Sequence, residues 1–64
     1  MILKFKTNPD INGNTRFIAI DTDKKQFARC SREIYPDAVI VSKSAIIAIK
    51  MQCYAADFTE VENM

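Results

Sequence analysis

The sequence predicts a small α+β domain in which a three- to five-stranded, mostly antiparallel sheet carries one amphipathic helix packed on one face. Strand-like runs fill the first half of the chain, and the apolar residues take up a helical period after Ser42. With 64 residues the chain has room for one domain, residues 1–64, whose elements run β-β-β-(β)-α-β. A domain of this size buries about 60% of the surface that its unfolded chain exposes, so its stability is expected to be marginal.

The first strand is predicted at residues 2–7, where apolar and charged residues alternate. Leu3 and Phe5 fall on one face of this strand, and Lys4 and Lys6 fall on the other. A period of two is typical of a strand that is buried on one face only. The lysines are therefore expected on a solvated face of the sheet.

Turn-forming residues gather at positions 8–14, which include Gly13, the only glycine of the chain. β-rich sequence resumes at residues 15–20, so the two runs are predicted to form a hairpin with a long connection. Oxygen-bearing side chains at Asp10 and at two alternate positions after it also resemble a calcium loop. However, Thr15 stands where such a loop requires glycine. A hairpin turn is the favoured interpretation.

The second predicted strand is apolar on both faces, with Phe17 and Ala19 on one and Ile18 and Ile20 on the other. The central strand of a three-stranded meander has this pattern, and residues 26–31 supply the third strand. The pattern leaves open which of the two faces meets the core.

Residues 38–41 form a short apolar run, either a fourth strand or an extended lead-in to the helix. Ser42 or Ser44 is the expected N-cap. The apolar spacing beyond it predicts an amphipathic helix of about three turns that ends near Ala56. Residues 58–62 alternate again and can add a final strand. A right-handed crossover is expected if that strand pairs parallel with the strand before the helix. The buried stripe of the helix is predicted to centre on Ile47, Met51, Tyr54 and Phe58, widened by Ile46, Ile49 and Cys53.

No set of catalytic or metal-binding residues stands out in this composition. Histidine is absent, which removes the commonest general base and the commonest metal ligand. Cys30 and Cys53 alone cannot supply the four ligands of a structural zinc site, and one glycine cannot build a phosphate-binding loop. We therefore expect a protein that is not an enzyme and that uses no cofactor and no metal.

The cysteines and the longest apolar stretch bear on location. Cys30 and Cys53 fit reduced, mostly buried thiols of a cytoplasmic protein, and the spacing leaves a single disulfide open as the alternative. Residues 38–56 are interrupted by Lys43 and Lys50, and each lysine near a bilayer centre costs roughly 2.5–3.5 kcal/mol. We expect a cytoplasmic chain without a membrane span.

Charge is distributed unevenly along the chain. Residues 1–32 carry seven Lys or Arg and three Asp or Glu, a net charge of +4, whereas residues 33–64 carry two and five, a net charge of −3. A basic patch on the open sheet face, next to phenylalanines on which bases can stack, would suit single-stranded or non-specific nucleic-acid binding. The residues of this alternative function are Lys4, Lys6, Arg16, Arg29 and Arg32.

The second strand favours a different function, protein–protein interaction. A chain this small has difficulty covering apolar residues on both faces of one strand, and oligomerisation is a usual remedy. The partner is either an unknown protein or a second copy of the chain in a homodimer. The competing interpretation is that these are scattered surface apolar residues.

A lysine-rich first strand, the Asn12-Gly13 turn, a Ser-Lys-Ser helix start at Ser42 and the ending at residues 58–62 follow one another in this chain. This order resembles a loose set of short, uncharacterised proteins from bacteriophages and mobile elements of Gram-positive bacteria. The chain departs from that pattern at the helix end, where Ala56 and Asp57 stand in place of a glycine. Such proteins generally have no assigned activity, so the resemblance implies a small accessory binding protein. The residues that carry it are Lys4, Lys6, Asn12, Gly13, Ser42, Lys43, Ser44 and residues 58–62.

Overall fold

The computed structural model describes residues 1–29 and 37–62 and confirms the α+β class. Arg32, Cys30 and the end of the predicted third strand lie outside the described residues. Within the described ranges the elements are β1 (Ile2–Lys6), β2 (Phe17–Asp21), β3 (Gln26–Ala28), β4 (Val39–Ile40), α1 (Lys43–Ala55) and β5 (Thr59–Glu60).

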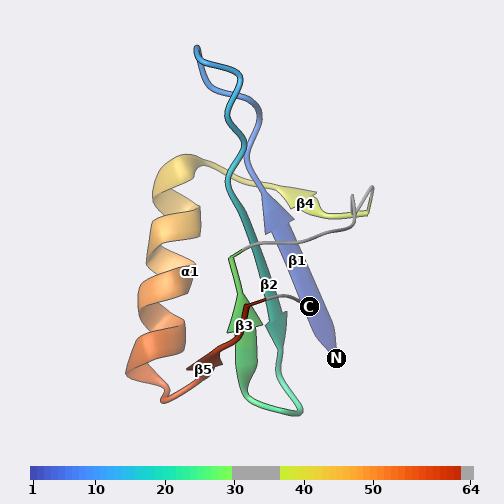
Figure 1. The fold of residues 1–64 in the computed structure, drawn as a ribbon, viewed down its shortest axis with the longest axis vertical. Coiled ribbons are helices and arrows are strands. Elements are labelled where there is room, and N and C mark those ends of the chain that lie inside the picture. Colours follow the sequence, from blue (N-terminus) through green and yellow to red (C-terminus); the bar gives the residue numbers. More distant parts are fainter. Residues whose placement is uncertain (30–36, 63–64) are drawn as a thin grey trace.

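The strands form one open, mixed sheet in the order β4-β1-β2-β3-β5, and α1 lies along one face of it (Figure 1). The three longest strands make the expected antiparallel meander. The two-residue strands β4 and β5 pair parallel with β1 and β3, at opposite edges of the sheet. The final strand therefore does not pair with the strand that precedes the helix, so the condition under which a right-handed crossover was expected is not met.

The hairpin of β1 and β2 is confirmed, and its long connection projects beyond the sheet (Figure 1). Asp10 closes the tip of this connection. Its Oδ1 accepts hydrogen bonds from the backbone N–H groups of Asn12 at 2.8 Å and Asn14 at 2.9 Å. Gly13 donates to the Asp10 carbonyl at 2.9 Å and has a φ of 80°, a conformation in which glycine carries no steric penalty. The tip presents Ile11, which is fully exposed.

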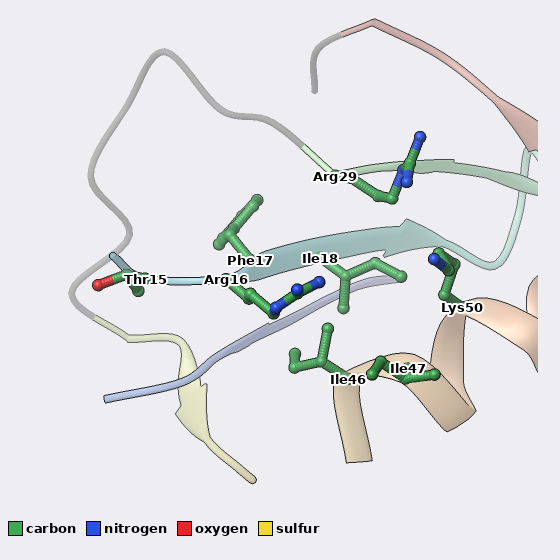
Figure 2. A pocket seen from close by; sticks show the side chains of 8 residues that line it. All are labelled: Thr15, Arg16, Phe17, Ile18, Arg29, Ile46, Ile47 and Lys50. Carbon is green, nitrogen blue, oxygen red and sulfur yellow. The ribbon is translucent and has the colours of Figure 1, made fainter. Parts of the chain in front are cut away.

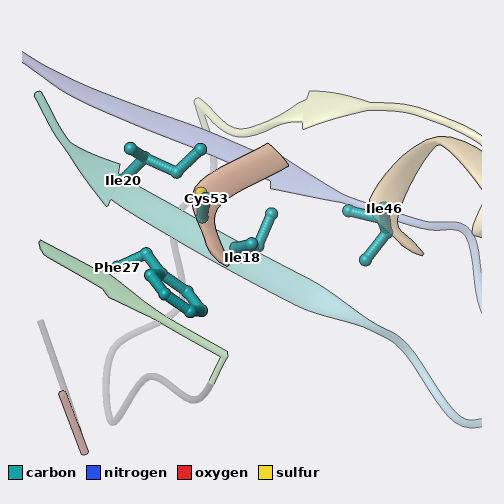
Figure 3. Packing of buried hydrophobic residues seen from close by; sticks show 5 residues of the cluster. All are labelled: Ile18, Ile20, Phe27, Ile46 and Cys53. Carbon is teal, nitrogen blue, oxygen red and sulfur yellow. The ribbon is translucent and has the colours of Figure 1, made fainter. Parts of the chain in front are cut away.

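The core lies between the sheet and α1 (Figure 3). Ile18, Ile20 and Phe27 contribute from the sheet, and Ile46 and Cys53 contribute from the helix. Each large apolar side chain buried here is worth roughly 1.5–3 kcal/mol. The face of β2 that carries Ile18 and Ile20 is therefore the one that meets the helix. Partly buried side chains pack around this cluster, namely Phe5, Val41, Ile49 and Phe58.

The opposite face of β2 is also covered. Ala19 pairs with Ala28 of β3, and neither alanine has any exposed surface. Phe17 is partly buried. The expectation of an uncovered apolar patch on the second strand is therefore wrong, because the apolar residues on this face of β2 are buried or partly buried.

Hydrogen bonds at both ends fix the limits of α1. Ser42 is the N-cap, and its Oγ accepts from the N–H of Ala45 at 3.1 Å. At the other end the N–H of Asp57 donates to the Tyr54 carbonyl at 3.1 Å, and that of Phe58 donates to the Cys53 carbonyl at 2.9 Å. This pair of bonds is a Schellman motif, in which the left-handed position usually holds glycine. Here Asp57 occupies that position with a φ of 61°.

Candidate interaction surface on the helix

The outward side of α1 carries large apolar residues. Ile47 is 37% exposed, Met51 is 63% exposed and Tyr54 is 50% exposed. The sequence places these three residues at the centre of the buried stripe, and that prediction is wrong. The buried residues of α1 are Ile46 and Cys53. Apolar residues at both spacings satisfy a helical period, so periodicity alone could not decide which side meets the sheet.

This outward side is also uncharged. We call it the outer helix face, and all of its side chains are exposed. A helix that is apolar on both sides is usually buried on both sides, and a contiguous apolar surface on a small protein commonly marks an interaction site. The outer helix face consists of Ser44, Ile47, Ala48, Met51, Tyr54 and Ala55.

Tyr54 is held in one orientation near the C-terminal end of the outer helix face. Its ring meets the ring of Phe27 edge-on, with centroids 5.2 Å apart and planes at 90°. Its hydroxyl donates a hydrogen bond to Oε1 of Glu60 at 3.1 Å. Desolvation by burial, followed by the neighbouring Glu60 carboxylate, raises the pKa of Tyr54. The exposed half of the ring is therefore presented by a side chain that is already fixed in place.

Glu60 is itself fixed by a cation. The Arg29 guanidinium donates through Nε to Oε2 and through Nη2 to Oε1 at 3.4 Å. These bonds, and to a lesser degree the Tyr54 hydroxyl, hold the pKa of Glu60 below its ordinary value. The Tyr54 hydroxyl thus donates its hydrogen bond to a carboxylate that stays ionised at neutral pH.

The ends of α1 carry opposite charges in an unusual order. Lys43 begins the helix, and Asp57, Glu60 and Glu62 follow its end. The helix macrodipole favours acidic residues at the start and basic residues at the end, and α1 has neither in its terminal turns. These charges therefore do not stabilise the helix through its macrodipole.

The structure separates the basic residues of the predicted nucleic-acid patch. Lys4 and Lys6 share the sheet face opposite the helix, and Lys4 Nζ pairs with Asp37 at 3.0 Å. That hydrogen bond lowers the pKa of Asp37. Arg16 and Arg29 instead border a pocket beside α1, where Lys50 joins them. The four of these residues that the structure describes therefore do not form one patch on the open sheet face, and Lys50 is a cation that the sequence interpretation missed.

Cys53 is a free, buried thiol, and desolvation by that burial raises its pKa. In residues 1–29 and 37–62 no group of three or more His, Cys, Asp or Glu is placed to hold a metal ion. In the same ranges no helix has the length and apolar character needed to cross a membrane.

Comparison of the chain with protein-family models, with curated proteins and with solved structures finds no match. The resemblance to short bacteriophage and mobile-element proteins therefore stays a prediction. The functional interpretation rests on the surfaces described above.

Proposed function

We propose that this chain is a non-enzymatic, cytoplasmic interaction domain that forms a homodimer through the outer helix face. The observation that carries the proposal is Tyr54, an exposed aromatic ring fixed by Phe27 and Glu60 within an uncharged, apolar surface. Tyrosine is enriched among residues that dominate binding energy, and a side chain ordered before association loses less entropy on binding. The free thiol of Cys53 supports a reducing compartment.

An antiparallel pairing of two α1 helices suits this surface. With the two-fold axis near Met51, Ile47 of each copy lies opposite Tyr54 of the other. Lys43 then approaches the acidic residues that follow the helix of the second copy, beginning with Asp57. In this arrangement the charges at the ends of α1 lie next to charges of opposite sign in the second copy. Within one copy the same charges oppose the helix macrodipole.

The size of the surface limits the strength of the dimer. A helix of 13 residues is about 20 Å long. Stable interfaces bury about 800 Å² on each partner, a large share of the 4642 Å² that this chain exposes. One helix face covers less than that area, so we expect a reversible dimer whose population depends on concentration in the micromolar range.

Sedimentation equilibrium of the purified chain, from about 10 µM to about 1 mM, tests the proposal. We expect a monomer–dimer equilibrium for the natural chain and monomers throughout for Met51→Glu, which places two carboxylates near the two-fold axis. Ile11→Glu is the matched control, because it introduces the same charge at a fully exposed apolar residue on the hairpin tip. A natural chain that stays monomeric over the whole range contradicts the proposal.

A charge exchange tests the antiparallel geometry separately. Lys43→Glu and Asp57→Lys should each weaken the dimer, since each brings like charges together across the interface. The double variant restores opposite charges at both ends and should recover most of the lost affinity. Additive weakening in the double variant would rule out this pairing of the helices while leaving other uses of the face open.

A further inference from the structure

A pocket of about 210 Å³ opens between the sheet and the first half of α1 (Figure 2). Its apolar part is formed by Phe17 and Ile18 of β2 and by Ile46 and Ile47 of the helix. Three cationic side chains also line it, and each comes from a different part of the fold. Arg16 precedes β2, Arg29 follows β3 and Lys50 lies in the middle of α1.

Among the described residues, those that line this pocket include no acid. Arg29 is paired with Glu60, which lies outside the lining. Among the residues that the structure describes, neither Arg16 nor Lys50 forms an ion pair with a carboxylate. The carboxylates that they influence from farther away are Asp10, near Arg16, and Glu60, near Lys50.

Folding therefore gathers three positive charges around one apolar hollow and balances only one of them by direct contact. Like charges held together raise the free energy of the folded chain, unless an anion occupies the space between them. The chemistry of the lining specifies what that anion is. Guanidinium groups donate in a planar fork that matches phosphate oxygens, and a lysine adds a point charge. The Thr15 hydroxyl at the same pocket can donate one further hydrogen bond.

We propose that this pocket binds the phosphate group of a small organic phosphate. Arg16 and Lys50 contact the phosphate oxygens, Arg29 adds donors while it remains paired with Glu60, and the three isoleucines contact the organic part of the ligand. Pockets for drug-sized ligands have volumes of roughly 300–1,000 Å³, so this smaller space suits a phosphate with a short apolar or flat group attached. All of these residues belong to one copy of the chain, so the inference does not rest on the proposed dimer, although Ile47 belongs to both surfaces.

Titration followed by amide chemical shifts tests the site with two probes, inorganic phosphate and adenosine monophosphate, at low salt. We expect saturable shifts centred on Arg16, Ile18 and Lys50 and binding that weakens as salt is added. Arg16→Gln and Lys50→Gln should each reduce the affinity about tenfold, as expected for the loss of one charge-assisted hydrogen bond. Lys6→Gln is the control, since it removes the same charge from the opposite face of the sheet.

The two probes distinguish the source of the phosphate. Tighter binding of the nucleotide assigns an organic phosphate to the pocket, whereas equal binding assigns free phosphate, and either result supports a phosphate site. Shifts that do not saturate, or an affinity that falls in Lys6→Gln as much as in Arg16→Gln, overturn the proposal. Binding of a short DNA strand without binding of either small probe also overturns it and points to an extended polyanion.

Discussion

The hydroxyl of Tyr54 donates a hydrogen bond to Oε1 of Glu60, 3.1 Å away, and joins the last turn of α1 to β5. Glu60 also accepts from Arg29, the residue that follows β3. The three side chains thus connect the helix, the edge strand and its neighbour in the sheet. The connection orients the aromatic ring on the outer helix face, on which the proposed dimer depends, and it holds Arg29 beside the pocket that we propose as a phosphate site.

Glu60 should make the stability of the fold sensitive to acid. Its pKa lies below the ordinary value of 4.5, chiefly because of the hydrogen bond from Arg29. A carboxyl whose pKa is lower in the folded chain stabilises that chain fully above its ordinary pKa. The contribution is lost as the pH falls through the lower, folded value. Urea unfolding should therefore show that Glu60→Gln destabilises the chain at about pH 7 and that this difference shrinks toward about pH 3.

Glu62→Gln provides the control for this acid response. Glu62 is an exposed carboxylate two residues farther along the chain, and no ion pair of the described residues includes it. Its substitution should leave the natural pH dependence of unfolding intact. If Glu60→Gln and the natural chain lose stability in parallel as the pH falls, Glu60 is not the group responsible.

The order of elements could be predicted from the sequence because each signal is local. Alternation defined β1, turn residues defined the hairpin, and two serines limited the N-cap of α1 to Ser42 or Ser44, of which the structure has Ser42. The pairing of β4 and β5 could not be predicted, since two residues carry almost no pattern. Parallel pairing joins segments far apart in the sequence, and only the folded chain shows which strands become neighbours.

The candidate surfaces were harder to predict for a related reason. Ile46 and Ile47 are adjacent apolar residues on α1, yet only Ile46 is buried. Which of the two is buried depends on the shape of the sheet surface against which the helix packs, and the helical period of the sequence contains no information about that shape. The position of Arg16 also depends on how the sheet packs. Arg16 and Ile18 are two residues apart, so their side chains lie on the same face of the sheet, which is the face that α1 covers. Once Ile18 is known to be buried against α1, the basic residues divide between the two faces.

The N-cap of α1 gives a prediction with an internal comparison. Ser42→Ala removes the acceptor of the Ala45 N–H and should destabilise the chain by about 1 kcal/mol. Ser44→Ala loses only an exposed hydroxyl contact with Ser42 at 3.1 Å and should cost much less. Chemical unfolding of the two variants measures the difference. Equal losses would mean that the Ser42 hydroxyl does not cap the helix in solution.

Cys53 should report on opening of the core. In Cys30→Ser it is the only thiol of the chain, and it lies buried against Ile18 and Phe27 in the core cluster. Burial also raises its pKa, so the reactive thiolate is scarce in the folded state. A disulfide reagent should label the native chain slowly and the urea-unfolded chain at the rate of a model thiol. Equal rates would show that the side chain is accessible without unfolding.

Asp57 should be replaceable by glycine with a gain in stability. It ends α1 in the left-handed region at a φ of 61°, where a side chain costs roughly 1 kcal/mol relative to glycine and aspartate somewhat less than most residues. Asp57→Gly keeps both hydrogen bonds of the Schellman motif and relieves that strain. The gain is reduced by the greater freedom of glycine in the unfolded chain.

We expect Asp57→Gly to raise the free energy of unfolding by about 0.5 kcal/mol, measured in urea. Ala55→Gly is the matched comparison, because it introduces glycine two residues earlier, at a position of helical conformation, and should lower stability by up to about 1 kcal/mol. Opposite signs for the two substitutions would locate the strain at the helix end. A loss of stability in both variants would show that Asp57 contributes more through its charge than it costs through its backbone.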